Sequence, residues 1–463
     1  MSMTQSYQAL YDAQKLFFKS GATKGHAFRK EQLLKLKRVL KENETLINDA
    51  LYKDLRKHPQ EVYMTETGAV YEEINVQIKN MRNWMRPKHV RSSLFLFPAK
   101  SVIYAEPVGN VLVISPWNYP ILLTLRAVAG AMAAGNTVLI KPSELSEHTS
   151  AAMAKIINEN FPAEYLHVVL GDGTEVVPAL LNNFHFDHVF FTGSTSVGAK
   201  IMEMAARHLS PVSLELGGKS PCIVAADANI KVAAKRIVWG KMISCGQTCV
   251  APDYLVVHAS VKDKLIAALI AEFEKGFGKN PKEHPSYPRL INQRRFEMVK
   301  KYLSEGTIVY GGQTDEADYY ISPTILENIK PDASVMREEI FGPVLPVFTY
   351  NTNEEVVELV EQNPYPLAFY VFTSNSKTEK YFIEHVRFGG GGINETILQL
   401  GNSELPFGGV GYSGHGGYLG KHSFDTFTNY KGVVKRATWF EPSFRHAPFK
   451  KGKEKIWRYL LGA

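Results

Sequence analysis

The fold of this 463-residue chain follows from the stretch HVFFTGSTSVGAK, which runs from His188 to Lys200. Its first five residues are mostly apolar and predict a buried β-strand. Gly193 ends this run, and the hydroxyls of Ser194 and Thr195 are typical helix N-caps. Backbone N–H groups at such a helix N-terminus bind phosphate. Many loops of this kind only cap their helix, so the stretch alone indicates a strand–helix unit and no function.

Apolar runs recur on both sides of this unit with strand, helix, strand spacing, which predicts a parallel sheet with helices on both faces. A second series begins near Ser220 and extends to about residue 420, so we expect two α/β domains. The four glycines from Gly389 to Gly392 are interpreted as a loop signal. Besides 188–192, the predicted strands are 111–115, 137–141, 165–170, 212–216, 221–224, 253–257, 307–310, 344–350 and 367–373.

The first 85 residues or so have helical periodicity, as in Leu33, Leu36 and Leu40, and predict a helical lead-in. Segments 90–98 and 101–105 predict two strands around a Pro-Ala-Lys turn. Such a hairpin could project from the body of the protein.

Composition excludes several classes of protein. Three cysteines cannot form a disulfide framework, and no Cys/His spacing matches a zinc site, so we expect a reducing compartment and no catalytic metal. The most apolar segment, 121–135, is interrupted by Arg126 and is too short to span a membrane. Residues 1–20 do not resemble a signal peptide. We therefore expect a cytoplasmic protein.

The net charge of +7 is concentrated at the C-terminal end. Residues 431–463 carry nine Lys/Arg and two Glu, a local excess of 9 − 2 = +7, so the remainder is about neutral and a nucleic-acid role is not expected. Near the end, basic and apolar side chains alternate as in a helix that rests on an anionic lipid surface or on the protein itself. The basic members are Lys450, Lys451, Lys453, Lys455 and Arg458.

Two further segments bear on dinucleotide binding. The pattern G-x-G-x-x-G occurs at 409–414, but it follows no strand and leads into more glycine, so a close-packed or flexible loop is the better interpretation. The strand 137–141 ends in Lys141-Pro142-Ser143-Glu144, at the carboxyl edge where open α/β sheets bind nucleotides. A surface lysine and a helix-capping glutamate are the alternative.

A nucleophile, a base and an oxyanion donor are all present. Cys249 needs a neighbouring base, because a free thiol is only slightly ionised at pH 7. Glu215 precedes two glycines and is predicted to be buried near a turn, which would raise its pKa toward working pH. The amide of Asn118 could donate to an oxyanion. Alone, Glu215 could be a surface carboxylate and Asn118 a turn residue.

Seven motifs stand in one order over about residues 100 to 430. They are 116-PWN-118, 141-KPSE-144, 191-FTGS-194, 215-ELGGKSP-221, 246-GQTC-249, 338-EEIFGP-343 and 406-PFGG-409. On these motifs the chain resembles the aldehyde dehydrogenases, and the run 420-GKHSFDTF-427 is similar to the class 3, fatty-aldehyde type. Two positions depart from the relatives' pattern: His415 stands where a Met is usual, and Cys245 where a polar or small residue is common.

The resemblance implies an α/β fold with a Rossmann-like cofactor domain (1–87 and 108–215), a catalytic domain (216–420), oligomerisation strands (88–107 and 421–437) and a basic tail (438–463). It implies a homodimer. It also implies that NAD, or NADP, accepts hydride while a medium- or long-chain aliphatic or aromatic aldehyde becomes an acid through a thiohemiacetal and a thioester on Cys249. Asn118 would hold the oxyanion, and Glu215 would activate water. The cofactor residues implied are Lys141, Ser143, Glu144, Gly193, Ser194, Val197, Glu339 and Phe341.

Two other functions remain open at this point. In a CoA-acylating relative the thioester passes to CoA, and the product distinguishes this enzyme from one that releases the acid. A catalytically silent binding protein on the same fold is disfavoured by the retention of nucleophile, base and oxyanion donor.

Overall fold

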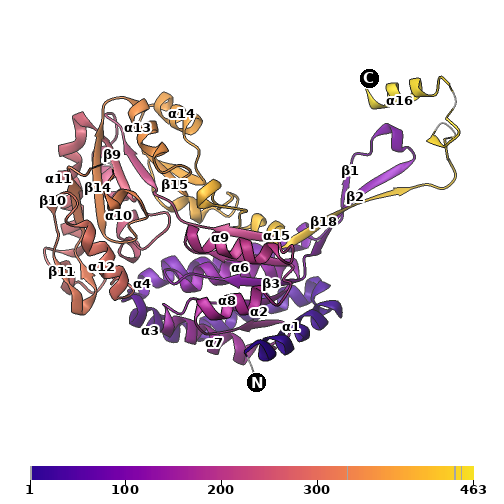
Figure 1. Cartoon of the computed structure of the whole chain (residues 1–463), viewed down its shortest axis with the longest axis horizontal. Coiled ribbons are helices and arrows are strands. Elements are labelled where there is room, and N and C mark those ends of the chain that lie inside the picture. Colours follow the sequence, from indigo (N-terminus) through magenta and orange to yellow (C-terminus); the bar gives the residue numbers. More distant parts are fainter. Residues whose placement is uncertain (1–2, 331, 443–444, 450, 463) are drawn as a thin grey trace.

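The computed structural model describes residues 3–330, 332–442, 445–449 and 451–462. Two α/β lobes and a long three-stranded arm make up the molecule (Figure 1). The first lobe carries the N-terminal helices, and the second lies at the opposite end from the arm (Figure 1). Within the described residues, no helix has the length and apolar character needed to cross a membrane.

The predicted helical lead-in is confirmed. Its helices are amphipathic, with Leu33, Leu36 and Leu40 fully or almost fully buried on one face of α2. Between α4 and α5 the chain forms a single π-helical segment, η2. The elements are α1 (Met3–Lys19), α2 (His26–Glu42), α3 (Glu44–Leu55), α4 (Pro59–Val62), η2 (Tyr63–Thr67) and α5 (Gly68–Trp84).

The first sheet has the strand order β17-β7-β6-β3-β4-β5, and only β17 runs antiparallel. The strands predicted in this region are present with small shifts at their ends. Because the other five strands of the sheet are parallel, their carboxyl ends lie at one edge, which is where nucleotides bind in such folds. The elements are β3 (Asn110–Ile114), α6 (Pro120–Ala134), β4 (Thr137–Lys141), α7 (Glu147–Asn160), β5 (Leu166–Val168), α8 (Gly173–Leu181), β6 (His188–Thr192), α9 (Thr195–Ala206), β7 (Val212–Glu215) and β17 (Gly414–His415).

The second sheet has the order β10-β13-β14-β9-β8-β15-β16. The interpretation of Gly389 to Gly392 as a loop is wrong, because Gly390–Ile393 forms β16, parallel to β15. A Cβ on Gly391 would lie 2.1 Å from the carbonyl oxygen of Phe369, so this close strand pairing needs glycine. Strand β13 was not predicted. The strands are β8 (Pro221–Val224), β9 (Tyr254–His258), β10 (Thr307–Tyr310), β13 (Thr324–Glu327), β14 (Val344–Tyr350), β15 (Ala368–Phe372) and β16.

Helices cover the second sheet, and a short hairpin accompanies it. The helices are α10 (Ile230–Met242), α11 (Lys262–Phe277), α12 (Gln293–Tyr302), α13 (Asn353–Glu361) and α14 (Ser376–His385), and the hairpin pairs β11 (Thr314–Asp315) with β12 (Tyr320–Ile321).

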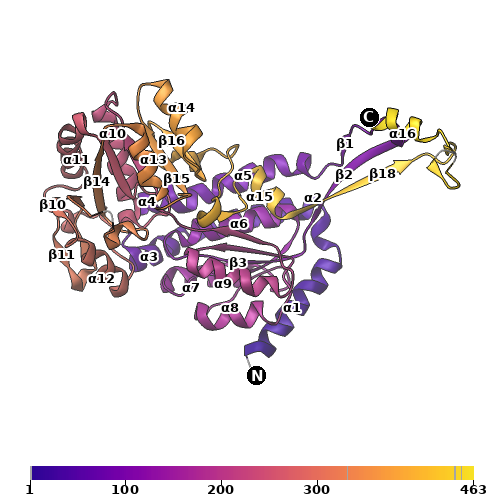
Figure 2. The same cartoon turned by 45° about the horizontal axis from the view of Figure 1, so that its top comes forward.

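The arm pairs β1 (Lys88–Val90) and β18 (Thr428–Arg436) with β2 (Ala99–Pro107), both antiparallel. The prediction of a strand over 90–98 is wrong in extent: β1 ends at Val90, and Leu94–Leu96 form a 3-10 turn. Two views show the arm standing away from the body (Figures 1 and 2).

Helix α15 (Lys421–Thr426) leads into β18, and helix α16 (Glu454–Leu461) lies near the tip of the arm (Figure 2). The ring of Trp457 on α16 lies 6.4 Å from that of Phe95. The predicted tail helix is thus present and touches the chain's own arm, while Lys450 lies outside the described residues.

Candidate active site

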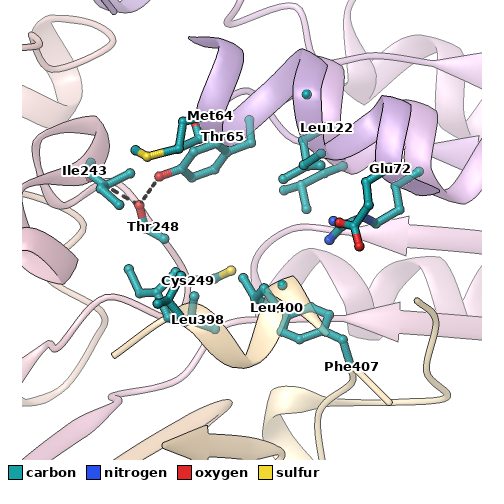
Figure 3. A pocket seen from close by; sticks show the side chains of 18 of the residues that line it. Met64, Thr65, Glu72, Leu122, Ile243, Thr248, Cys249, Leu398, Leu400 and Phe407 are labelled. Carbon is teal, nitrogen blue, oxygen red and sulfur yellow. Dashed lines mark hydrogen bonds between the residues drawn. The ribbon is translucent and has the colours of Figure 1, made fainter. Parts of the chain in front are cut away.

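Two cavities meet at Cys249. The first, of about 390 Å³, lies between the N-terminal helices, α6 and the loops after α10 and β16. Its walls are mainly apolar, as Figure 3 shows for Leu122, Ile243, Leu398 and Phe407. The second, of about 630 Å³, lies over the carboxyl ends of β6 and β7 and continues into the second lobe. A side chain at the junction can contact molecules in both cavities.

The chain around Cys249 has an uncommon backbone conformation. After α10, Ser244 and Cys245 have φ values of 51° and 56°. Gly246 follows with φ of 75°, and a Cβ there would lie 2.3 Å from the carbonyl oxygen of Gly342. The N–H of Ser244 donates to Oε1 of Glu61 at 2.7 Å. A side chain from the N-terminal helices therefore holds the loop that leads to the thiol.

Cys249 is half-buried, and burial raises the pKa of its thiol. The carboxylates of Glu339 and Glu215 raise this pKa further, against an opposing effect of the backbone N–H groups of Cys249 and Val250. The thiol is therefore protonated at neutral pH in the free protein. A nucleophilic Cys249 requires a proton acceptor close by.

Glu215 ends β7 and is 2% exposed. No described residue donates a hydrogen bond to either oxygen of its carboxylate. Burial raises the pKa of Glu215 well above its usual value. The predicted burial of Glu215 and the predicted direction of its pKa shift are therefore confirmed. A carboxylate without donors, in the same cavity as the thiol, can accept a proton from a water molecule beside that thiol.

The backbone of Glu215 is fixed by the late glycine loop. Gly414 in β17 pairs with Glu215, and a Cβ on Gly414 would lie 2.0 Å from the carbonyl oxygen of Leu214. Residues 409–414 thus pack against a strand and form no phosphate cradle at the start of a helix. His415 is exposed in this loop.

Asn118 is buried between β3 and α6, and its Nδ2 donates to the carbonyl oxygen of Gln247 at 3.0 Å. Tyr119 and Thr248 are joined by a hydroxyl–hydroxyl bond of 2.5 Å. These two contacts tie the amide-bearing turn to the segment just before Cys249. Since a side-chain amide has two N–H groups, one remains to donate to a substrate oxygen.

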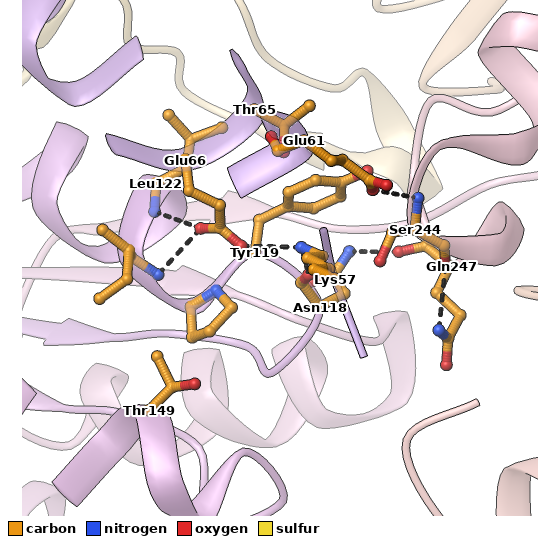
Figure 4. Close-up of polar contacts among 12 residues, drawn as sticks. Lys57, Glu61, Thr65, Glu66, Asn118, Tyr119, Leu122, Thr149, Ser244 and Gln247 are labelled. Atoms are coloured by element: carbon orange, nitrogen blue, oxygen red, sulfur yellow. Dashed lines mark hydrogen bonds and ion pairs between the residues drawn. The ribbon is translucent and has the colours of Figure 1, made fainter. Parts of the chain in front are cut away.

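A buried ion pair beneath this turn was not predicted. Lys57 and Glu66 are both fully buried, and Nζ of Lys57 lies 2.7 Å from Oε1 of Glu66. The same ammonium donates to the carbonyl oxygen of Asn118 at 2.7 Å (Figure 4). The second oxygen of Glu66 accepts from the N–H groups of Ile121 and Leu122 at the start of α6. In the sequence, a lysine and a glutamate nine residues apart look like solvent-exposed helix residues, so no local signal identifies them.

Cys245 packs rather than reacts. It is fully buried, its Sγ donates to the hydroxyl of Tyr287 at 3.7 Å, and burial raises its thiol pKa to about 12. Such a thiol is not ionised at neutral pH.

Four of the predicted cofactor residues line the second cavity. Ser194 caps α9, accepting from the N–H of Val197 at 3.4 Å, and Gly193 precedes it. Glu339 lies so close to Gly217 that a Cβ there would be 1.9 Å from its Oε2, and burial raises its pKa to about 8. Phe341 packs on Trp117 at 5.5 Å between ring centres.

The other four predicted cofactor residues are Lys141, Ser143, Glu144 and Val197, and they do not line the second cavity. Nζ of Lys141 donates to Oε2 of Glu144 at 3.1 Å, and the same oxygen accepts from the N–H of Gly173 at the start of α8. They extend the carboxyl edge of the sheet, from β6 to β4. The capped start of α9, the Lys141–Glu144 ion pair and the second cavity lie on one sheet edge and together fit a dinucleotide.

The chain was compared with known proteins. The model of the aldehyde dehydrogenase family matches residues 2–433. The 4,4'-diaponeurosporen-aldehyde dehydrogenase of Staphylococcus aureus is 46% identical over 450 residues, which are 97% of this chain and 97% of that protein. Aldehyde dehydrogenase family 3 member A2 of Pongo abelii is 42% identical, over 96% of this chain and 92% of the relative.

Solved structures agree. The substrate-bound state of Staphylococcus aureus AldH has a TM-score of 0.96 and 43% identity, and the match covers 100% of both chains. An NAD+ complex of an aldehyde dehydrogenase from Bacillus cereus has a TM-score of 0.84 and 29% identity, over 94% of this chain and 89% of the other. The chain therefore belongs to the aldehyde dehydrogenase family and is an NAD(P)-dependent enzyme that oxidises aldehydes.

Proposed function

We propose that the protein oxidises medium-chain aliphatic or aromatic aldehydes to carboxylic acids, with Cys249 as nucleophile, Asn118 as oxyanion donor and Glu215 as general base. One observation carries the proposal: Cys249 lies where an apolar cavity meets the cavity of the dinucleotide edge. The substrate carbonyl can therefore reach the sulfur from one cavity while the hydride acceptor approaches the same carbonyl carbon from the other.

The chemistry begins when the thiol of Cys249 gives up its proton to water and the resulting thiolate adds to the aldehyde carbon. The free N–H of the Asn118 amide and the backbone N–H of Cys249 would donate to the oxyanion that forms. The former aldehyde carbon then loses a hydride, for which nicotinamide, when bound, supplies the acceptor. This loss leaves a thioester on Cys249, and a water deprotonated by Glu215 attacks the carbonyl carbon of the thioester. The C–S bond then breaks, releasing the acid and the thiol.

The apolar lining supports an apolar substrate body. Tyr119 and Ile243 both line the first cavity, and no described residue of the C-terminal segment does. The cavity volume of about 390 Å³ falls at the lower end for small-molecule sites, which favours medium rather than very long chains.

Glu144 supports a preference for NAD. A carboxylate that accepts a bond from the ribose 2′-hydroxyl repels the 2′-phosphate of NADP. Lys141, bonded to Glu144, partly offsets that repulsion, so we expect a preference rather than exclusion.

We also propose a homodimer built on the arm, with a cytoplasmic location. Strand β18 is exposed along most of its length, including Val433 and Val434, and β2 covers one side of it. An exposed edge strand on a projecting sheet is a typical site for strand pairing between copies. For α16, with Ile456, Tyr459 and Leu461 exposed, contact with a lipid surface is the further proposal.

A panel of alkanals and aromatic aldehydes, assayed with NAD and with NADP, tests the function. We expect NAD reduction with medium-chain alkanals or aromatic aldehydes and a carboxylic acid as product, with and without CoA. Formation of acyl-CoA, or absence of turnover with every aldehyde, would contradict the proposal.

A further inference from the structure

Arg126 is a buried cation in the wall of the apolar cavity. It lies in α6, a helix whose residues are all buried, and is 3% exposed. Together with Cys249 it lines the first cavity. Among the described residues, none accepts a hydrogen bond from its guanidinium or forms an ion pair with it, and its Nε is a buried nitrogen without a partner.

Other buried arginines of the same chain are paired. Nε of Arg29 donates to the carbonyl oxygen of Thr23 at 2.9 Å, and its Nη1 donates to that of Ala133 at 3.0 Å. Arg289 forms an ion pair with Asp318 at 2.7 Å. A guanidinium is always charged, and burial of a charge without a partner is strongly unfavourable. Arg126 is therefore the exception that requires an explanation from the cavity.

Tyr418, another residue of the cavity wall, lies near both Arg126 and Cys249. Burial raises the pKa of its hydroxyl, Arg126 lowers this pKa, and Glu215 and Cys249 raise it. Glu72 also lines the cavity, but its side chain is exposed. Figure 3 shows Glu72 and Leu122 on one wall, and Cys249 and Leu398 across from them.

We propose that Arg126 binds a carboxylate on the substrate, so that the preferred substrates are ω-oxo carboxylic acids: aldehydes that carry an acid at the far end of an apolar chain. This inference rests on the proposed function. A guanidinium and a carboxylate form two parallel charge-assisted hydrogen bonds, and the ligand would supply the partner that the folded chain does not. The apolar walls between Arg126 and Cys249 would hold the methylene chain.

The test compares each alkanal with the ω-oxo acid of the same chain length, over a series from six to about ten carbons. The measured quantity is the ratio of kcat/KM for the oxo acid to kcat/KM for the alkanal. For the wild type we expect this ratio to exceed 1 at one or more lengths. In Arg126→Met the ratio should fall about 10- to 100-fold, the range for loss of one charge-assisted hydrogen-bonded pair.

Two further measurements separate binding from a structural role. Arg126→Lys keeps the charge but not the planar fork, so its ratio should lie between those of wild type and Arg126→Met. Octanedioate should raise the Tm of the wild type more than octanoate does, and this difference should disappear in Arg126→Met. Because the guanidinium has no partner to lose, Arg126→Met should not lower the Tm of the free protein.

Failure of the carboxylate site and failure of the proposed function give different results in these measurements. If the wild type oxidises no aldehyde, the proposed function fails. If it oxidises alkanals but shows a ratio at or below 1 at every length, or if Arg126→Met leaves the ratio unchanged, the carboxylate site is wrong. A Tm loss of many degrees in Arg126→Met would likewise show a structural arginine and overturn it.

Discussion

Replacement of Lys57 by Met should lower both the stability of the protein and its turnover, because it breaks a buried ion pair beneath Asn118. The variant removes the ammonium that lies 2.7 Å from both Glu66 and the carbonyl oxygen of Asn118. Both partners of the ion pair are fully buried, so Glu66 would be left as an uncompensated buried charge. Breaking such a pair costs about 3–5 kcal/mol. At about 2–4 °C per kcal/mol, the Tm of the first lobe should fall by roughly 6–20 °C.

Turnover should fall as well, for a different reason. The carbonyl group of Asn118 loses its donor, and the turn that aims the side-chain amide at the substrate is no longer fixed from below. A displacement of about 1 Å in a catalytic group costs roughly 100-fold in rate. We therefore expect kcat to fall by about 10- to 100-fold, while the KM for NAD changes little because Lys57 lies away from the dinucleotide edge.

The double variant Lys57→Met/Glu66→Gln is the matched control. It removes the unpaired charge, and the side chain of Gln can still accept from the N–H groups at the start of α6, so most of the Tm should return. The donor to Asn118 stays absent, so kcat should stay low. Thermal unfolding and steady-state kinetics are measured on the same preparations. A Lys57→Met protein with wild-type Tm and kcat, or a double variant in which both recover together, would refute the positioning role.

Three further outcomes are expected. Asn118→Ala should lower turnover by about 10²–10³, the usual cost of one oxyanion donor, and a loss of tenfold or less would leave Asn118 as a turn residue. Glu215→Gln should retain the pre-steady-state burst of NADH while slowing the steady state. In the wild type the hydrolysis rate should rise as the pH passes the raised pKa of Glu215, and this rise should be absent from the variant. Parallel loss of burst and steady state would contradict the role of Glu215 as the hydrolytic base. The folded protein holds the Glu339 proton up to about pH 8, whereas the unfolded chain releases it near 4.5, so the free energy of unfolding should fall as pH rises between these values. Chemical denaturation at several pH values measures this fall, and Glu339→Gln should flatten it.

Local chemistry made the main members of the candidate site predictable, and the structure brings them into one cavity. Strand ends followed by Gly, Ser or Pro identified the carboxyl edge that carries Ser194 and Lys141, and the order of the motifs placed Cys249, Glu215 and Asn118 in one site. The strand at Gly390–Ile393 was missed because glycine normally indicates a loop, whereas here the close approach of β15 requires it.

What could not be predicted depends on contacts between distant segments. Lys57 and Asn118 are 61 positions apart, and only the fold brings the ammonium to that carbonyl group. Arg126 was noticed only as the charge that interrupts an apolar segment. Its lack of a partner among the residues that the structure describes follows from the packing of α6 against the cavity and has no counterpart in the local sequence.

The central claim is that an acyl group is carried by the sulfur of Cys249. The direct measurement is mass spectrometry of Glu215→Gln quenched soon after mixing with hexanal and NAD, because slow hydrolysis in this variant lets the thioester accumulate. Trypsin releases residues 242–262 as one peptide, which contains both Cys245 and Cys249, so fragmentation distinguishes the two thiols. The account predicts a hexanoyl group on Cys249, none on Cys245, and none without NAD. An acyl group on another residue, or none on this peptide while NADH forms in the burst, would contradict it.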